Sequence, residues 1–269
     1  DTDFNRFGWA GSGADDWAMI ESPHQLWSVV IPTIWRSSYT LELLQKLNNE
    51  ALVGEIILID NAPAEGSPDL SGLHKIIHLP QRSNIYVNPA WNLGVSSAKY
   101  AQICICNDDI LFNTSVFSAA AQHLLLEQKT TIIGAHHESF SLESDVSISF
   151  SRGHWVGQGW GCVLFFQKKY WRDIPPQLKI FSGDKYITTI FPNTHSIRFK
   201  VDTVMSSSSG SREFNPIKDK DRHNFELLTN YYSRAKWLCK HATSFGRFSL
   251  SIFLFFSLKN IALWARSKK

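Results

Sequence analysis

The sequence is poor in three features that would each define a functional class: cysteine, net charge and a long apolar run. It has four cysteines in 269 residues. Two of them, Cys104 and Cys106, stand two apart on a predicted strand and share one face, which does not suggest a disulfide framework. The formal net charge of +3 is small and the charges are interspersed, so the total does not indicate a nucleic-acid partner. With no visible signal peptide, a reducing compartment, the cytoplasm, is expected.

The C-terminal segment, residues 241–269, combines an apolar run with basic residues. The run is about eleven residues long, and a helix that spans a bilayer needs roughly twenty. The flanking basic residues are Arg247, Lys259, Arg266, Lys268 and Lys269. Two interpretations remain open for 245–269: an interfacial helix on an anionic membrane, or a helix that packs on the main domain or on a partner domain.

Residues 27–240 are predicted to form one α/β domain, preceded by an irregular N-terminal extension over 1–26. Continuous apolar runs predict strands over 27–31, 55–61, 75–80 and 100–106. Helical spacing separates these runs, over 39–49 and 88–100. Apolar strands that alternate with helices indicate a mostly parallel, Rossmann-like sheet with helices on both faces.

The second half of the domain has a different texture. Alternation predicts half-exposed strands over 145–150 and 196–201, and an apolar run predicts a strand over 162–166. A helix is expected to begin near Asp184, and a long helix is expected over 218–240.

Polar residues follow three of the predicted strands. They are Pro32-Thr33, Asp60-Asn61 and the run Asn107-Asp108-Asp109. The carboxyl ends of parallel strands are where α/β sheets bind ligands. Buried acids need a cation or a hydrogen-bonding partner, so these strand ends predict a ligand site. A plain surface turn is the alternative interpretation.

Seven motifs in order resemble the family 2 type of GT-A glycosyltransferase. They are VVIPTIWR, EIILIDN, NPAWNLGV, CNDDILF, GWGCVLFF, SGDKYI and YYSRAKW. The chain is similar in particular to bacterial and large-virus enzymes that build surface polysaccharides. The resemblance implies the GT-A fold, followed by C-terminal helices. It also implies inverting, metal-dependent transfer of a sugar from a nucleotide-diphosphate sugar to a saccharide acceptor.

The resemblance implies a cation, Mn²⁺ or Mg²⁺, at the acidic motif. Such hard cations prefer carboxylate, diphosphate and water oxygens. The family's motif is usually Asp-x-Asp or Asp-Asp-Asp, and this chain has Asn107 in the first position. Asp109 is then the implied metal ligand. Asp108 is implied to contact the ribose or the sugar, and Asn107 can still hydrogen-bond a ribose hydroxyl.

Five further residues are implied to bind the donor: Pro32, Thr33 and Arg36 after the first strand, then Asp60 and Asn92. The donor itself is expected to be of the UDP, dTDP or GDP type. Arg36 could instead be an ordinary solvated arginine, and Asp60 a turn residue.

On the acceptor side the resemblance implies Trp155, Trp160 and Gly161, since apolar faces of sugars stack on aromatic rings. Both tryptophans could instead be core residues. Asp184 is the implied catalytic base, with a helix cap as its alternative role. His195 is a further candidate near the diphosphate. The acceptor is expected to be a saccharide or a glycolipid.

Two other functions are alternatives to this one. A nucleotidyltransferase on a similar sheet would show a glycine-rich loop with Arg or Lys after the first strand, and the segment IPTIWRSS lacks one. A saccharide-binding module without catalysis would not need both Asp109 and Asp184.

Overall fold

The computed structural model describes residues 26–63, 66–127, 130–152, 159–204 and 212–242. By the density of its contacts the chain divides into two units, residues 1–218 and 219–269. Within the described residues, no helix is long and apolar enough to cross a membrane. The expected N-terminal extension and almost all of the C-terminal segment 241–269 lie outside the described residues.

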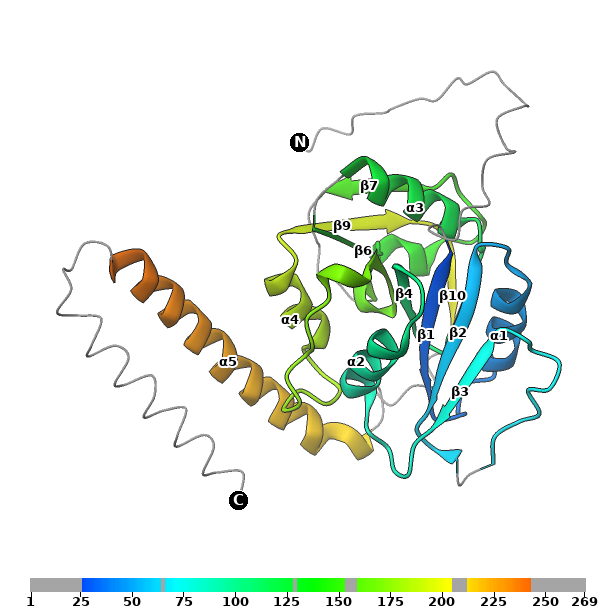
Figure 1. The fold of residues 1–269 in the computed structure, drawn as a ribbon, viewed down its shortest axis with the longest axis horizontal. Coiled ribbons are helices and arrows are strands. Elements are labelled where there is room, and N and C mark those ends of the chain that lie inside the picture. The colour runs from blue at the N-terminus through cyan, green and yellow to red at the C-terminus, as the bar shows by residue number, and fades with distance from the viewer. Residues whose placement is uncertain (1–25, 64–65, 128–129, 153–158, 205–211, 243–269) are drawn as a thin grey trace. The chain divides into compact units, whose positions relative to one another are not determined.

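The first unit is built on an eight-stranded sheet in the order β3-β2-β1-β4-β8-β6-β9-β7 (Figure 1). The first four of these, in sheet order, are all parallel: β3 (Ile76–Pro80), β2 (Val53–Asp60), β1 (Trp27–Thr33) and β4 (Gln102–Cys106). The rest form a mixed half: β8 (Val163–Gln167), β6 (Thr131–Ala135), β9 (Asn193–Arg198) and β7 (Ser149–Arg152). β8 runs antiparallel to β4 and β6, and β7 antiparallel to β9. The expected mostly parallel α/β sheet is confirmed.

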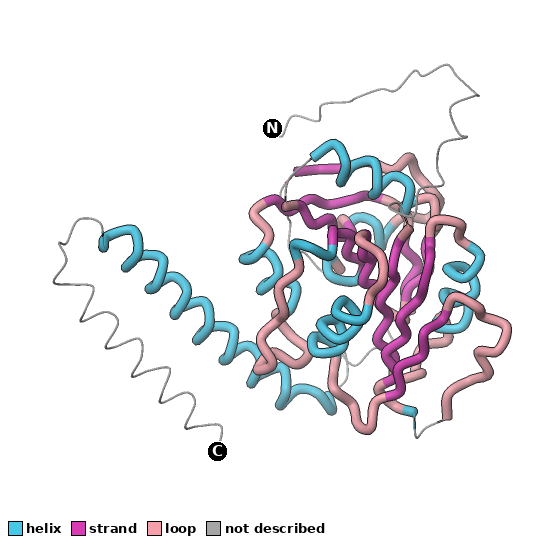
Figure 2. Tube along the Cα trace, viewed as in Figure 1, coloured by secondary structure: helices cyan, strands magenta, loops and turns pink. Residues whose placement is uncertain are grey.

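Helices cover both faces of this sheet, as Figure 2 shows in cyan around the magenta strands. On one face, alternate residues of β1 pack with leucines of α1 (Thr40–Asn49) and with Phe117 of α3 (Val116–Glu127). On the other face, Gly94 of α2 (Val87–Ser97) lies against the Val30 side chain, so closely that a β-carbon there would clash. The apolar runs of the sequence are therefore strands buried from two sides.

Two of the expected strands have different bounds in the structure. The alternating stretch 145–150 was expected to be a strand, but only Ser149–Arg152 pairs with β9. The expected strand 196–201 is two strands, because the chain leaves β9 after Arg198 and resumes in β10 (Val201–Thr203). β10 pairs with β5 (Ile110–Phe112) as a separate two-stranded sheet. Alternating apolar and polar residues indicate that every second side chain is buried. This pattern can continue through a turn between two sheets, so it does not mark where a strand ends.

The remaining helices are α4 (Gly183–Ile190) in the first unit and α5 (Asn215–Ala242), most of which lies in the second. Both were expected, α4 from a start near Asp184 and α5 from the stretch 218–240. Helix α4 precedes β9 in the chain, and Asp184 in its first turn belongs to the first unit, as do the strand ends.

Candidate active site

A cavity of about 270 Å³ lies where the strands of the parallel half end. Pro32 and Thr33 end β1 there, and Asn107 and Asp108 follow β4. Asp184 reaches the same cavity from the first turn of α4. Arg36 and Gly161 also line it. The structure thus brings together seven of the sequence-predicted site residues, of which the first and last, Pro32 and Asp184, are 152 positions apart.

The backbone beside this cavity is strained. Among the described residues, a positive φ outside glycine occurs at Trp35 (59°), Tyr86 (69°) and Ser182 (61°). Tyr86 and Ser182 line the cavity, and both neighbours of Trp35 do so as well. Strained backbone of this kind costs about 1–3 kcal/mol per residue and clusters at ligand sites, so its location supports a functional role for the cavity.

The two acids after β4 are held at the edge of the core. The hydroxyl of Thr33 donates to Oδ2 of Asp108 at 2.6 Å. Burial raises the pKa of Asp108 to about 6; the Thr33 hydroxyl opposes the rise and the neighbouring Asp109 adds to it. Asp109 is only 5% exposed and does not line the cavity. Its backbone carbonyl accepts from the Thr203 hydroxyl at 3.2 Å.

Cys162 lies close to both the acidic motif and Asp184. The Nδ2 of Asn107 donates to its Sγ at 3.5 Å, and Cys162 lines the cavity. Burial raises the pKa of its thiol to about 12, and the nearby charges of Asp109 and Asp184 add to the rise. Both carboxylates therefore act on one sulfur, although they come from opposite halves of the sheet. Sequence reasoning did not select Cys162.

Asp184 is placed at the cavity by close packing rather than as a helix cap. Residue Ser182 occupies the N-cap position of α4, and Asp184 accepts from the backbone N–H of Lys185 at 2.8 Å. A β-carbon built on Gly161 would lie 3.1 Å from Cβ of Asp184. Glycine at 161 thus lets the start of α4 approach the segment before β8.

A bridge between two loops at the cavity involves Arg36. Its Nη1 lies 3.3 Å from Oε2 of Glu213, with side chains 43% and 60% exposed. A pair this exposed contributes little to stability. The ion pair with Glu213 therefore holds Arg36 beside the cavity without adding much to the stability of the fold.

Among the described residues, five sequence-predicted site residues stand outside the cavity lining: Asp60, Asn92, Asp109, Trp160 and His195. Asp60 is buried and accepts from Ser67 at 2.5 Å, from the backbone of Ala62 and from His78, while its neighbour Asn61 lines the cavity. The side chain of Asn92 instead bonds the backbone N–H and carbonyl of Ile174, at 3.0 and 2.9 Å.

Of the two tryptophans expected on the acceptor side, Trp160 is a buried residue. Trp160 is 1% exposed, and its Nε1 donates to the carbonyl of His195 at 3.2 Å. Its ring packs so closely on Gly134 that a β-carbon there would clash. Trp160 is thus a core residue, next to Gly161 in the chain. Trp155 lies outside the described residues.

His195 is also away from the cavity lining. It lies in the middle of β9, and its Nδ1 is 2.6 Å from Nε2 of His123. The expectation that it stands near a diphosphate is not supported by this position.

The structure adds residues to the cavity that the sequence alone did not single out. The polar and aromatic ones among them include Asn84, Tyr86, Phe181, Lys185 and Phe214. Asn84 shapes its loop by accepting from the N–H of Tyr86 at 2.8 Å. An Asn two residues before a positive-φ residue is a turn signal that could have been recognised.

The acidic motif fits a hard divalent cation. Asp108 and Asp109 are adjacent carboxylates at the edge of the core. Burial raises the pKa of Asp108 and the charge of Asp109 adds to the rise, so an ionised carboxylate is costly there. A cation would offset this cost, and oxygen ligands suit Mn²⁺ or Mg²⁺.

A doubly covered α/β sheet with acids and a cavity at its strand ends defines the class of α/β proteins that bind ligands at the carboxyl ends of their strands. The family model Glycosyl transferase family 2 matches residues 28–202, well over half of the chain. The chain belongs to this family, and its fold is the GT-A fold.

Solved structures of Staphylococcus aureus TarS are similar in fold. Residues 1–349 of TarS match with a TM-score of 0.50 and 11% identity, over 66% of this chain and 60% of that one. A longer TarS structure matches with a TM-score of 0.49 and 12% identity, over 67% and 37%. The TarS 1–349 complex with UDP gives 0.48 and 12%, over 66% and 60%. The chain spans less than two thirds of these structures. No curated protein sequence matches it.

Proposed function

We propose that the protein is an inverting, metal-dependent glycosyltransferase. It moves a sugar from a nucleotide-diphosphate sugar to a hydroxyl of a saccharide acceptor, in the synthesis of a glycan or surface polysaccharide. The observation that carries this proposal is that Asp108 and Asp184 line one cavity, with Asp109 next to Asp108 at the edge of the core. Family membership supports the same chemistry.

The carboxylates have separate tasks. Asp109 holds the cation, with Asp108 beside it, and Thr33 orients Asp108 through the 2.6 Å hydrogen bond. A bound Mn²⁺ or Mg²⁺ supplies charge neutralisation for the departing diphosphate. Asp184 accepts the proton of the acceptor hydroxyl while that oxygen forms a bond to the anomeric carbon. The bond from this carbon to the diphosphate oxygen breaks in the same step, and the nucleoside diphosphate leaves.

A single base suffices for this reaction because it is a direct displacement, which inverts the anomeric carbon. Among the described residues, no lysine or arginine side chain forms an ion pair with Asp184, and the N–H of Lys185 donates to its carboxylate. Its carboxylate is free to accept a second hydrogen bond from a hydroxyl, since each oxygen has two lone pairs.

The donor and acceptor enter from the two halves of the sheet. Pro32, Thr33, Arg36, Asn61 and Asn107 offer polar groups for the nucleotide and diphosphate. Gly161 lines the acceptor side, with the core residue Trp160 next to it in the chain. Asp60 acts indirectly by fixing the loop that starts at Asn61, because it accepts from Ala62 and Ser67.

The domain assignment is part of the proposal. Residues 27–240 are the transferase domain, and 1–26 are an extension. The segment 245–269 contacts either an anionic membrane or a partner domain. A cytoplasmic enzyme would have its donor, of the UDP, dTDP or GDP type, at hand, and a saccharide or glycolipid as acceptor.

A thermal-shift screen tests the donor side of the proposal. UDP-, dTDP- and GDP-sugars are added to the full chain with and without Mn²⁺, since ligand binding raises stability with concentration and affinity. One nucleotide class should raise Tm by several degrees only when Mn²⁺ is present. Equal, small shifts for all donors in both conditions would contradict the proposal.

Donor hydrolysis separates the remaining functions. A binding module would raise its Tm with the donor yet release no nucleoside diphosphate. A nucleotidyltransferase would respond to a sugar phosphate and nucleoside triphosphate, and would release pyrophosphate. The proposed transferase releases the nucleoside diphosphate.

A further inference from the structure

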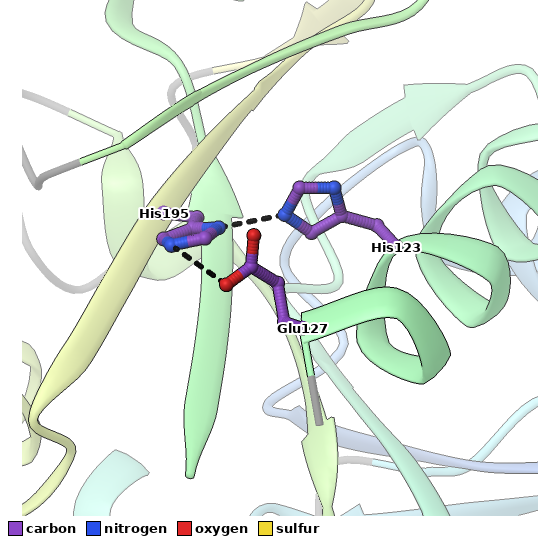
Figure 3. Close-up of side chains that lie close together, drawn as sticks. All are labelled: His123, Glu127 and His195. Carbon is purple, nitrogen blue, oxygen red and sulfur yellow. Dashed lines mark hydrogen bonds and ion pairs between the residues drawn. The ribbon is translucent and has the colours of Figure 1, made fainter. Parts of the chain in front are cut away.

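Three potential metal ligands meet between α3 and β9, away from the residues that line the cavity. His123 and Glu127 stand four apart on α3 and so share one face of the helix. His195 reaches them from β9, with Nδ1 2.6 Å from Nε2 of His123 and Nε2 4.0 Å from Oε2 of Glu127. Figure 3 shows the three side chains pointing toward one another. One ligand atom from each lies within 4.8 Å of the other two.

The surroundings hold these side chains in place. His195 is 3% exposed, and its backbone carbonyl accepts from Trp160. The ring of Phe150 stacks on His123, with centroids 4.0 Å apart and planes 7° from parallel. Nη2 of Arg152 lies 3.5 Å from Oε1 of Glu127. The cluster thus has a rigid base on β9, a stacked cover and one adjustable carboxylate at its open side.

We propose that His123, Glu127 and His195 form a site for a divalent transition metal of the zinc class, separate from the cation site at Asp109. Two imidazole nitrogens and one carboxylate are a known zinc ligand set, and water completes the tetrahedron. The acidic motif offers only oxygen ligands and suits Mn²⁺ or Mg²⁺. The two sites therefore select different ions by ligand chemistry.

The geometry is close to that of a metal site. Tetrahedral zinc with Zn–N bonds of about 2.0–2.1 Å separates two ligand nitrogens by about 3.3 Å. The 2.6 Å between His123 and His195 must therefore open by less than 1 Å. His123 is half-buried on a helix and can rotate away from the strand. Glu127 can turn one oxygen inward while Arg152, whose side chain is 84% exposed, follows it or lets go.

A metal in this place would fasten the end of α3 to the mixed half of the sheet. His195 is linked through its carbonyl to Trp160, and Trp160 precedes Gly161 at the cavity. Zinc bound to the folded state stabilises it by mass action. We expect zinc at this site to raise the stability of the folded protein and to leave the preference for Mn²⁺ or Mg²⁺ at the acidic motif unchanged.

Competition titration tests the site directly. Metal-free full-length protein is titrated with ZnCl₂ against a chromophoric chelator, and separately with CoCl₂, whose visible absorption reports tetrahedral nitrogen and oxygen ligation. Wild type should bind one tight equivalent. His123→Gln, Glu127→Gln and His195→Ala should each weaken it at least about tenfold to a hundredfold, since even groups that only orient a ligand have effects of this size.

Matched controls separate a metal site from a purely structural cluster. Arg152→Gln removes the competing ion pair of Glu127, so zinc affinity should stay or rise. Under a structural interpretation this variant lowers Tm and zinc changes nothing. His136, His137 and Glu138 form a second, largely exposed group of potential metal ligands. The double variant His136→Ala/His137→Ala removes both histidines of this group. The tight equivalent should survive this change.

Two results would overturn the proposal. One is a wild type that binds no zinc at micromolar concentration. The other is zinc binding that persists unchanged in Glu127→Gln and His123→Gln. His195 is deeply buried, so His195→Ala is interpreted only if circular dichroism shows a folded protein. The two helix variants give the answer without it.

Discussion

The two halves of the sheet have different construction and different tasks. The parallel half, β3-β2-β1-β4, alternates with helices and ends in Thr33, Asn61, Asn107 and Asp108 at the cavity. The mixed half, β8-β6-β9-β7, follows no such alternation and contributes Gly161, Cys162 and, through α4, Asp184. Donor binding thus depends on one half, and proton removal on the other.

This division means that the two functions should be separable by mutation. Changes in the parallel half should affect the cation and the donor. Changes in the mixed half should lower turnover while donor affinity stays. The following variants test the separation, from the largest expected effect to the smallest.

The largest effect is expected for Asp109→Ala, at the end of the parallel half. Loss of the metal ligand removes several kcal/mol of transition-state stabilisation, so transfer should fall at least about a thousandfold. Mn²⁺-dependent donor binding should be lost as well, measured by thermal shift and calorimetry. Asp109→Asn preserves the volume of the buried side chain and controls for packing. Full activity of wild type in excess chelator would contradict this assignment.

Asp184→Asn should lower kcat at least about a hundredfold, because asparagine cannot accept the proton of the acceptor hydroxyl. Donor affinity and Tm should remain those of wild type, since the amide oxygen can still accept from the N–H of Lys185. Steady-state kinetics with donor calorimetry give both quantities. A variant with near-normal turnover would place the base elsewhere.

Gly161→Ala tests the contact between α4 and the segment before β8. The new β-carbon would lie 3.1 Å from Cβ of Asp184, so α4 must shift by a few tenths of an ångström. Because catalysis is sensitive to placement on this scale, kcat should fall about tenfold and the donor Kd should not change. A weakened donor with unchanged kcat would reverse the assignment of the two sides.

The smallest effect is expected for Asp60→Asn, in the parallel half. Burial raises the pKa of Asp60, but hydrogen bonds from Ser67, Ala62 and His78 outweigh it and leave the pKa below the usual 3.8. A lowered folded-state pKa stabilises the protein above pH 3.8, and this contribution is lost as pH falls through the folded-state pKa.

Melting curves between about pH 2 and 7 test this sign. The variant should melt a few degrees below wild type at neutral pH, and the difference should shrink as acid protonates Asp60. A Tm difference that grows in acid would show that burial prevails over the hydrogen bonds.

The parallel half could be predicted from the sequence because its strands are buried on both faces. Val29 to Ile31 and Ile56 to Ile59 are apolar without interruption, and each run ends in polar residues at the ligand edge. The local sequence therefore predicts both the strands and the residues that stand at the site. The same holds for Asp108, whose strand end is visible in the sequence.

Other features depend on contacts that no local pattern records. Asn92 bonds the backbone of Ile174, 82 positions away, and so does not reach the cavity lining. His195 contacts His123, 72 positions away. His123 lies on α3, and neither α3 nor the following strand β6 was predicted from the sequence. Trp160 looked like a sugar platform, but its position before β8 directs the ring against Gly134 in the core.

The most direct test of the account is the configuration of the sugar released from the donor. The full chain is incubated with Mn²⁺ and each of the UDP-, dTDP- and GDP-sugars, and proton NMR follows the anomeric signal before mutarotation. We predict that at least one donor is consumed, only with the cation, and that the first sugar released has the inverted anomeric configuration. A retained configuration, or no donor consumed in any combination, would contradict an inverting transferase site at Asp109 and Asp184.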